Sequence, residues 1–165
     1  DEIIAQKEDN LQLKEMQLNE EINYKNKQLT TYTLHFIQKN EALKELRIKI
    51  FHSLRNPEKN TDSKALKGFL EVIDDNFRND EEWKNFKLYF EQVHAGFFEK
   101  LKEENPALTA QDLRHCSLIR LNLSIKEIAT IMGISVESVK TSRFRLRKKM
   151  NIESQQELND YIMTI

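Results

Sequence analysis

The sequence predicts an all-α protein, built from a long N-terminal helix, a small helical connector and a C-terminal four-helix domain. Composition favours this class, because only three Gly and two Pro interrupt 165 residues, of which 32% are charged and 39% are hydrophobic. Apolar residues recur at helical spacing, and no run alternates as a strand would. We expect the boundaries at 1–55, 56–63, 64–105 and 106–165, with the second segment acting as a linker.

The first fifty residues carry a heptad pattern in one constant frame. Heptad position d is occupied by Ile4, Leu11, Leu18, Tyr32 and Leu46. The companion position a is occupied by Ile22, Leu29, Phe36, Leu43 and Ile50. Such a stripe needs a partner helix, most simply a second copy in a parallel coiled coil, so we expect the a residues to form the seam of a homodimer. The alternative is an amphipathic helix folded back on its own chain.

A short aromatic-rich connector follows the long helix. Pro57 ends that helix, and residues 56–63 are polar with turn chemistry. Helical spacing then groups the apolar residues into three sets: Phe69, Leu70, Ile73 and Phe77; Trp83, Phe86, Phe90 and Val93; and, after Ala95-Gly96, Phe97, Phe98 and Leu101. Aromatic stripes at this spacing are typical of packing, so we expect residues 64–105 to form a small helical core.

Capping signals predict four helices after Asn105-Pro106, near 110–121, 125–132, 136–150 and 155–163. Ser135 is one cap, and three further pairs have the spacing of a capping box: Thr109 with Asp112, Ser124 with Glu127, and Ser154 with Glu157. Gly133 allows a tight turn between the second and third helices, because Gly tolerates a positive φ. Two short helices joined by such a turn form a helix-turn-helix, whose second helix enters the major groove of DNA.

Positive charge is concentrated on the third of these helices. Residues 140–149 hold six of the 26 Lys and Arg residues and no acidic residue, although the whole chain has a net charge of −1. Residues 108–150 carry nine basic and three acidic residues, a net charge of +6. A local field of this sign is expected where a protein binds a polyanion. A solvated face that complements the helix dipole would explain Lys148 and Lys149, but not Lys140 and Arg143.

The helix over 136–150 has an inner and an outer face. Val136, Val139, Leu146 and Met150 are spaced to point inward. The outer faces carry Lys140, Thr141, Phe144, Arg145, Arg147 and Lys148. We expect Lys140, Thr141 and Phe144 to reach base edges, because Lys donates to guanine and apolar groups touch the thymine methyl. The phosphates of double-stranded DNA are expected to be neutralised by Arg143, Arg145, Arg147 and Lys148.

The C-terminal segment resembles the LuxR-type (GerE-like) four-helix DNA-binding domain over about residues 107–165. The resemblance is carried by Leu108-Thr109, Ser124-x-Lys-Glu-Ile-Ala129, Ile134-Ser135, Ser138-Val-Lys140, Arg143 and Lys149-Met-Asn-Ile152. The sequence departs from the family at Ser142, where His is usual, at Ser138, where Thr is usual, and at Asn122, where Gly is frequent. The resemblance implies that the last helix contributes to dimerisation. Residues 136–149 also resemble region 4 of sigma factors, which shares this helix-turn-helix.

More loosely, the whole arrangement is similar to the cytoplasmic ends of bacterial membrane-anchored regulators. The resemblance implies a sensor upstream of the chain, and the first residue, Asp1, suggests that a segment precedes it. No run of about 18 apolar residues exists, so we expect a cytoplasmic protein whose membrane contact comes only through that upstream segment.

Catalytic chemistry is not indicated. Residues 52–57, HSLRNP, resemble the phospho-acceptor box of sensor histidine kinases, but Ser53 stands where an acidic residue usually follows the His. Phosphorylation of His52 by another protein is left open. No nucleophile, paired carboxylate, phosphate loop or metal-ligand spacing stands out, so no cofactor, metal or small-molecule substrate is expected. The single Cys116 excludes an internal disulfide and favours a reducing compartment.

These patterns together predict a dimeric, sequence-specific transcription regulator without enzymatic activity. RNA polymerase is a further candidate partner. Two alternatives stay open: a coiled-coil signalling or scaffold module whose basic helix docks on an acidic protein, and a protein that acts like sigma-factor region 4.

Overall fold

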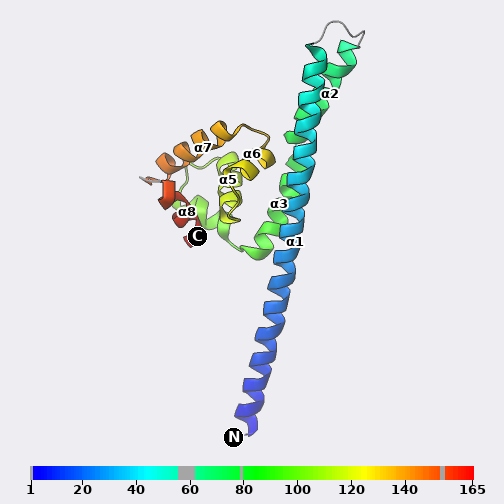
Figure 1. Cartoon of the computed structure of the whole chain (residues 1–165). Helices are drawn as coiled ribbons and strands as arrows, with labels where there is room; N and C mark the ends of the chain where they lie inside the picture. The colour runs from blue at the N-terminus through cyan, green and yellow to red at the C-terminus, as the bar shows by residue number, and fades with distance from the viewer. Residues whose placement is uncertain (1, 56–61, 79, 153–154) are drawn as a thin grey trace.

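The computed structural model describes residues 2–55, 62–78, 80–152 and 155–165, and these residues form helices and no strand (Figure 1). The helices are α1 (Glu2–Leu54), α2 (Ser63–Phe77), α3 (Asp80–Val93), α4 (Phe97–Glu104), α5 (Ala110–Arg120), α6 (Ile125–Met132), α7 (Val136–Lys149) and α8 (Gln155–Thr164). The predicted all-α class is confirmed. Most of the predicted linker and the predicted cap Ser154 lie outside the described residues.

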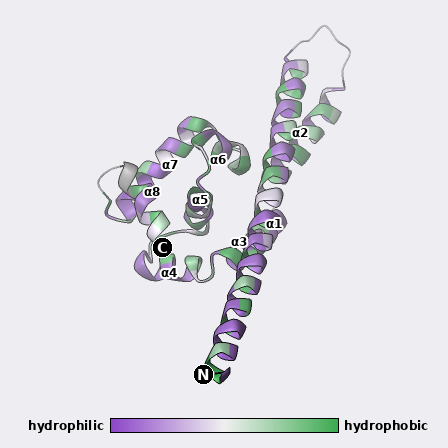
Figure 2. Cartoon of the chain, turned by 60° about the horizontal axis from the view of Figure 1, so that its bottom comes forward, coloured by the Kyte–Doolittle hydropathy of each residue, from purple (hydrophilic) through white to green (hydrophobic). Residues whose placement is uncertain are grey.

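α1 is one uninterrupted helix of 53 residues, about 80 Å long at 1.5 Å per residue. Its sequence contains neither Gly nor Pro, so nothing breaks its backbone hydrogen bonds. α2 folds back beside the C-terminal end of α1, and α3 lies along the middle of α1 (Figure 1). The N-terminal part of α1 projects beyond the rest of the molecule in both views (Figures 1 and 2).

The a residues of the heptad pattern have different surroundings along α1. Leu29, which is 3% exposed, and Ile50 are buried, whereas Phe36 and Leu43 are half-buried. α1 packs against α2, α3 and α6 of the same chain. Leu29, Phe36 and Ile50 are therefore packed within the chain rather than free for a dimer seam, as in the alternative of a helix folded against its own chain. The seam stays a prediction for Leu43 and Ile22. Ile22 remains 51% exposed.

Aromatic side chains connect α1 to α3 and α4. The rings of Phe36 and Trp83 meet edge-on with their centroids 6.3 Å apart, and the centroids of Trp83 and Phe86 are 4.6 Å apart. Phe90 and Phe97 continue this chain of contacts at 5.2 Å between centroids. Phe86 and Phe90 are completely buried. These aromatic side chains pack closely, and they belong to one core cluster that also contains residues of α1 and of the C-terminal helices.

Two details of the connector separate what the sequence predicts well from what it does not. Gly96 adopts a φ of +76° and divides α3 from α4, as the Ala95-Gly96 pair predicted. Phe69 instead points into solvent from α2, although its spacing grouped it with the buried Ile73. α2 is covered on one side by α1, and Phe69 lies outside that contact.

The four C-terminal helices share one core beside α1. Completely buried side chains in this core come from each of the four: Leu118, Ile128, Val139, Leu146, Leu158 and Ile162. α6 lies against the middle of α1, and α7 lies on the side of α6 that faces away from α1 (Figures 1 and 2). This arrangement leaves the outer face of α7 open.

Candidate nucleic-acid interface

Local capping explains why α5, α6 and α7 begin where they do. Thr109 and Asp112 form a capping box at α5, and Ser124 and Glu127 form another at α6. The hydroxyl of Ser135 accepts from the backbone N–H of Ser138 at 3.1 Å and starts α7. The predicted starts of these helices are confirmed to the residue.

The turn between α6 and α7 depends on a left-handed backbone at Gly133. Its φ of +64° ends α6, and its N–H donates to the carbonyls of Ala129 and Thr130. Asn122, at the position where the resembling family often has Gly, also has a positive φ of 56°. Asn is among the residues that tolerate this conformation best, so the departure from the family pattern leaves the turn intact.

The inner face of α7 is fixed by apolar packing. Val139, Leu146 and Met150 are buried, as are Ile128 and Ala129 of α6, and all five belong to one core cluster. Val136 is half-buried. The predicted inward residues therefore point inward, and the opposite side of α7 is set by this packing rather than by free rotation of the helix.

The outer face of α7 carries cations around an exposed aromatic ring. Lys140, Thr141, Arg145 and Lys148 are exposed, and Phe144 is 49% exposed. The Lys148 ammonium lies 4.7 Å from the centroid of the Phe144 ring, and the half-buried Arg147 lies 5.6 Å from it. An aromatic ring held between two cations offers an apolar contact for a base and positive charge for phosphates in one place.

Lys140 and Thr141, near the start of α7, are held to its first turn. The Lys140 ammonium donates to the Glu137 carboxylate at 2.8 Å, and the Thr141 hydroxyl donates to the Glu137 carbonyl at 3.0 Å. Both residues are exposed, so the Lys140 ion pair is solvent-screened and contributes little to stability. Exchanging this partner for a DNA acceptor therefore costs little.

Arg143 does not belong to this surface. Its side chain is only 5% exposed, and its Nη2 donates to Oδ1 of Asn159 on α8. The prediction that Arg143 neutralises a phosphate is wrong, because the guanidinium turns under α7 and holds α8 against it. The sequence contained no local signal for this contact, since Asn159 lies on another helix.

A buried histidine supports α7 from below. Nδ1 of His115 on α5 lies 2.9 Å from the hydroxyl of Ser142, and the imidazole is completely buried. Burial, reinforced by the nearby Arg143 charge, lowers the pKa of His115 from 6.5 to about 4. The imidazole is therefore neutral at pH 7, and Ser142, which stands where the resembling family usually has His, provides its partner.

Lys149 is also tied into the fold. Its ammonium lies 2.5 Å from a carboxylate oxygen of Asp112 in the capping box of α5. Burial raises the pKa of Asp112, but the hydrogen bonds from Lys149 and Thr109 outweigh it, so the pKa lies below its ordinary value. The cations left for a ligand are thus Lys140, Arg145, Lys148 and, in part, Arg147.

The described residues contain no group of three or more His, Cys, Asp and Glu side chains placed to hold a metal ion. Cys116 is buried, and burial raises the pKa of its thiol. Within the same part of the chain, no helix combines the length and the apolar character needed to cross a bilayer.

Residues 120–150 match the family model described as sigma-70, region 4. The match runs from the end of α5 through α6 and the turn to the end of α7, which is less than half of the chain. No curated protein and no solved structure matches the chain. The geometry of α6 and α7 and this match together support a helix-turn-helix of the DNA-binding type at residues 120–150.

Proposed function

We propose that this chain is a sequence-specific DNA-binding transcription regulator that places α7 in the major groove. The observation that carries the proposal is the outer face of α7, which is exposed, rich in cations and fixed by packing on its other side. Such a helix can follow the groove with phosphate contacts while presenting a few side chains to base edges. A regulator of this kind has no catalytic step of its own.

The proposal divides the outer face into two roles. Lys140, Thr141 and Phe144 lie within about one helical turn on the leading half of α7 and are assigned to base edges. Arg145, Arg147 and Lys148 are assigned to phosphates, which give affinity and register. The LuxR-type residue pattern supports the same division, because the positions matching Lys140, Thr141 and Phe144 face bases in that family.

The division can be tested by measuring binding to a pool of duplexes at several salt concentrations. Lys140→Ala should relax the preference among sequences by about 1–3 kcal/mol at the base pair that it contacts. Lys148→Ala should weaken all sequences alike and reduce the slope of log affinity against log salt by about one. Arg78→Ala, which removes an exposed cation of the connector, serves as the control. An unchanged sequence preference in Lys140→Ala would refute its assigned role.

We also propose that the regulator is a homodimer paired through the projecting part of α1. Ile4, Leu11, Leu18 and Ile22 are exposed there, and they continue the heptad stripe whose later members include the buried Leu29 and Ile50. A second copy aligned in parallel would cover this stripe, although Glu8 and Glu15 at a positions weaken the pairing. Sedimentation analysis of Leu11→Glu/Leu18→Glu should show a loss of dimer, and Leu34→Glu, exposed elsewhere on α1, should not.

Within this proposal the chain is the output end of a larger signalling protein, and two bound chains read a pseudo-palindromic site. Helix-turn-helix dimers place their recognition helices about 34 Å apart, one turn of DNA. The sigma-70 region 4 match favours a second candidate function, binding to RNA polymerase in the manner of a sigma factor. Co-purification with core polymerase in the absence of DNA distinguishes the two, because a regulator of the first kind does not require it.

A further inference from the structure

One side chain of α1 completes the end of α6, the first helix of the helix-turn-helix. Asn40 is 1% exposed, and its Nδ2 donates to the carbonyl of Thr130 at 3.1 Å and to that of Ile131 at 2.9 Å. The last carbonyls of a helix have no partner within it, so they need one from outside. The turn after α6 supplies partners to Ala129 and Thr130, and Asn40 supplies one to Ile131.

Burying Asn40 at this position has a cost in free energy. Its Oδ1 is buried and has no hydrogen-bond partner among the described residues. Burying a polar atom without a partner costs free energy, and an apolar side chain would avoid that cost but would leave the carbonyl of Ile131 without its donor. The two effects on stability oppose each other, so what distinguishes Asn40 from an apolar residue is the directed contact of its amide with the end of α6.

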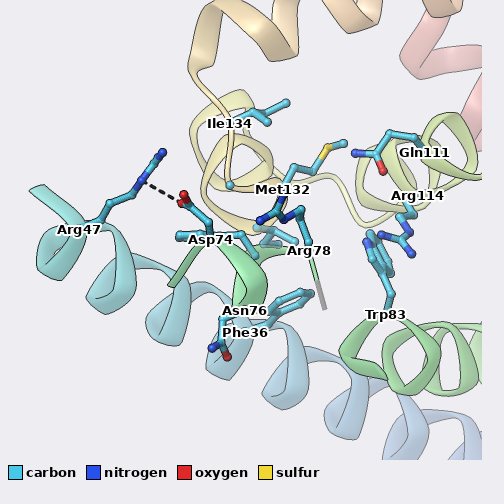
Figure 3. A pocket seen from close by; sticks show the side chains of 13 residues that line it. Phe36, Arg47, Asp74, Asn76, Arg78, Trp83, Gln111, Arg114, Met132 and Ile134 are labelled. Carbon is cyan, nitrogen blue, oxygen red and sulfur yellow. Dashed lines mark ion pairs between the residues drawn. The ribbon is translucent and has the colours of Figure 1, made fainter. Parts of the chain in front are cut away.

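Two open pockets interrupt the contact between α1 and the C-terminal helices about one helical turn from Asn40, which lines neither of them. One open pocket of about 430 Å³ lies between α1 and the turn after α6, where Phe36 and Arg47 lie across from Met132 and Ile134 (Figure 3). Phe77 of α2 and Gly133 of the turn also line it. A smaller one of about 150 Å³ separates Leu29, Thr33 and Ile37 from Leu121 and Leu123. Close packing alone would lock two elements together, but a contact interrupted by open pockets leaves more of the alignment to directed contacts.

The turn after α6 has a second contact, which comes from the stalk, the name used here for α1 and α2 together. A Cβ added to Gly133 would lie 2.6 Å from Cδ1 of Phe77 on α2. The turn that starts α7 is thus seated on Phe77, while the end of α6 is held by Asn40. Both contacts come from the α1–α2 stalk, and both act on the segment that sets the direction of α7.

We propose that Asn40 is a positioning residue, which sets the angle of α6 and hence of the recognition helix α7 relative to α1. A displacement or rotation of α1 is then carried into the orientation of α7. For its consequence at DNA this inference rests on the proposed function, but the orientation itself can be measured without DNA.

The test measures the distance between spin labels on exposed Gln38→Cys of α1 and Lys148→Cys of α7, diluted with unlabelled chain so that pairs within one chain are seen. Cys116 is buried and stays unlabelled. The wild-type background should give a narrow distance distribution. Asn40→Leu, which keeps the branching and the number of side-chain heavy atoms but removes the donor, should broaden it, and so should the smaller Asn40→Ala. Asn26→Ala, an exposed Asn on the same helix, should leave it narrow.

A distribution in Asn40→Leu as narrow as in the wild type would overturn the proposal, since packing would then suffice. If Asn40→Leu and Asn40→Ala both failed to fold by circular dichroism, Asn40 would be a stability residue and the proposal would also fall. In a second arm, Asn40→Leu should bind a single half-site with the affinity of the wild type. For DNA with two half-sites, the ratio of its affinity at the best spacing to its affinity at other spacings should fall toward one. If no duplex binds the wild type, the proposed function fails while the label distances still decide the role of Asn40.

Discussion

α1 carries the same apolar stripe over two stretches with opposite surroundings. From Leu29 onward most of the stripe packs against α2, α3 and α6 of the same chain, and only Leu46 is exposed there, whereas Ile4, Leu11, Leu18 and Ile22 all remain exposed. An apolar helix face needs a partner in both places, and the chain itself provides one only for the stretch that begins at Leu29. The difference teaches that a heptad pattern identifies a face to be covered but does not say which helix covers it.

The largest effect on stability is expected when one leucine of each stretch is replaced by Ala and the two losses are compared. Leu29→Ala should lower the free energy of unfolding by about 2–5 kcal/mol, because the buried side chain leaves a cavity. Leu18→Ala should lower the free energy of unfolding of the dilute monomer by less than about 0.5 kcal/mol, because Leu18 is 51% exposed. Urea unfolding at low protein concentration measures both, and equal losses would show that the two stretches are not different.

α7 also has a covered and an open side, and the buried His115 of α5 contacts its covered side through Ser142. The stability that depends on this histidine should change with pH. Because the pKa of His115 is lowered from 6.5 to about 4, the unfolded chain binds its proton first as pH falls. The free energy of unfolding is therefore full above pH 6.5 and should fall by on the order of 3 kcal/mol by pH 4. His115→Gln should flatten this part of the stability curve. A curve that keeps its full slope in the variant would mean that carboxylates alone cause it.

A smaller effect compares two glycines. Gly133→Ala should cost about 1–3 kcal/mol, since it strains a positive φ and forces Cβ against Phe77. Gly68 lies inside α2 with open space around it, so Gly68→Ala should stabilise the fold by about 0.5–1 kcal/mol. Thermal unfolding of the two variants should shift in opposite directions. Shifts of the same sign would contradict the seating of the turn on the stalk.

Much of the C-terminal domain could be predicted because its signals are local. Ser124 with Glu127 and Gly133 fix the start and end of α6 within a few residues of sequence, and the structure has them there. The inward turn of Arg143 and the role of Asn40 could not be predicted. Their partners, Asn159 and the end of α6, are distant in the chain, and a charged or polar residue on a helix looks solvated until the neighbouring element is placed.

The expectation that Leu29 lies in a dimer seam was wrong for the same physical reason. Leu29 has the spacing of a coiled-coil residue, and its cover by the same chain depends on how α2, α3 and α6 fold back. Periodicity contains no information on that return path. The four cations assigned to the outer face of α7 stay a prediction until a ligand is measured, whereas their placement on the open side follows from the packing of Val139 and Leu146.

The most direct test of the central claim, that the outer face of α7 binds DNA, is the salt dependence of duplex binding in a triple variant. Lys140→Gln/Arg145→Gln/Lys148→Gln should retain its helicity and reduce the slope of log affinity against log salt by about two, because Arg145 and Lys148 each lose a phosphate contact and about one counterion is released per contact. Lys7→Gln/Lys14→Gln/Lys27→Gln, with the same charge change on α1, should leave the slope as in the wild type. Equal slopes in the wild type and both variants would contradict the claim.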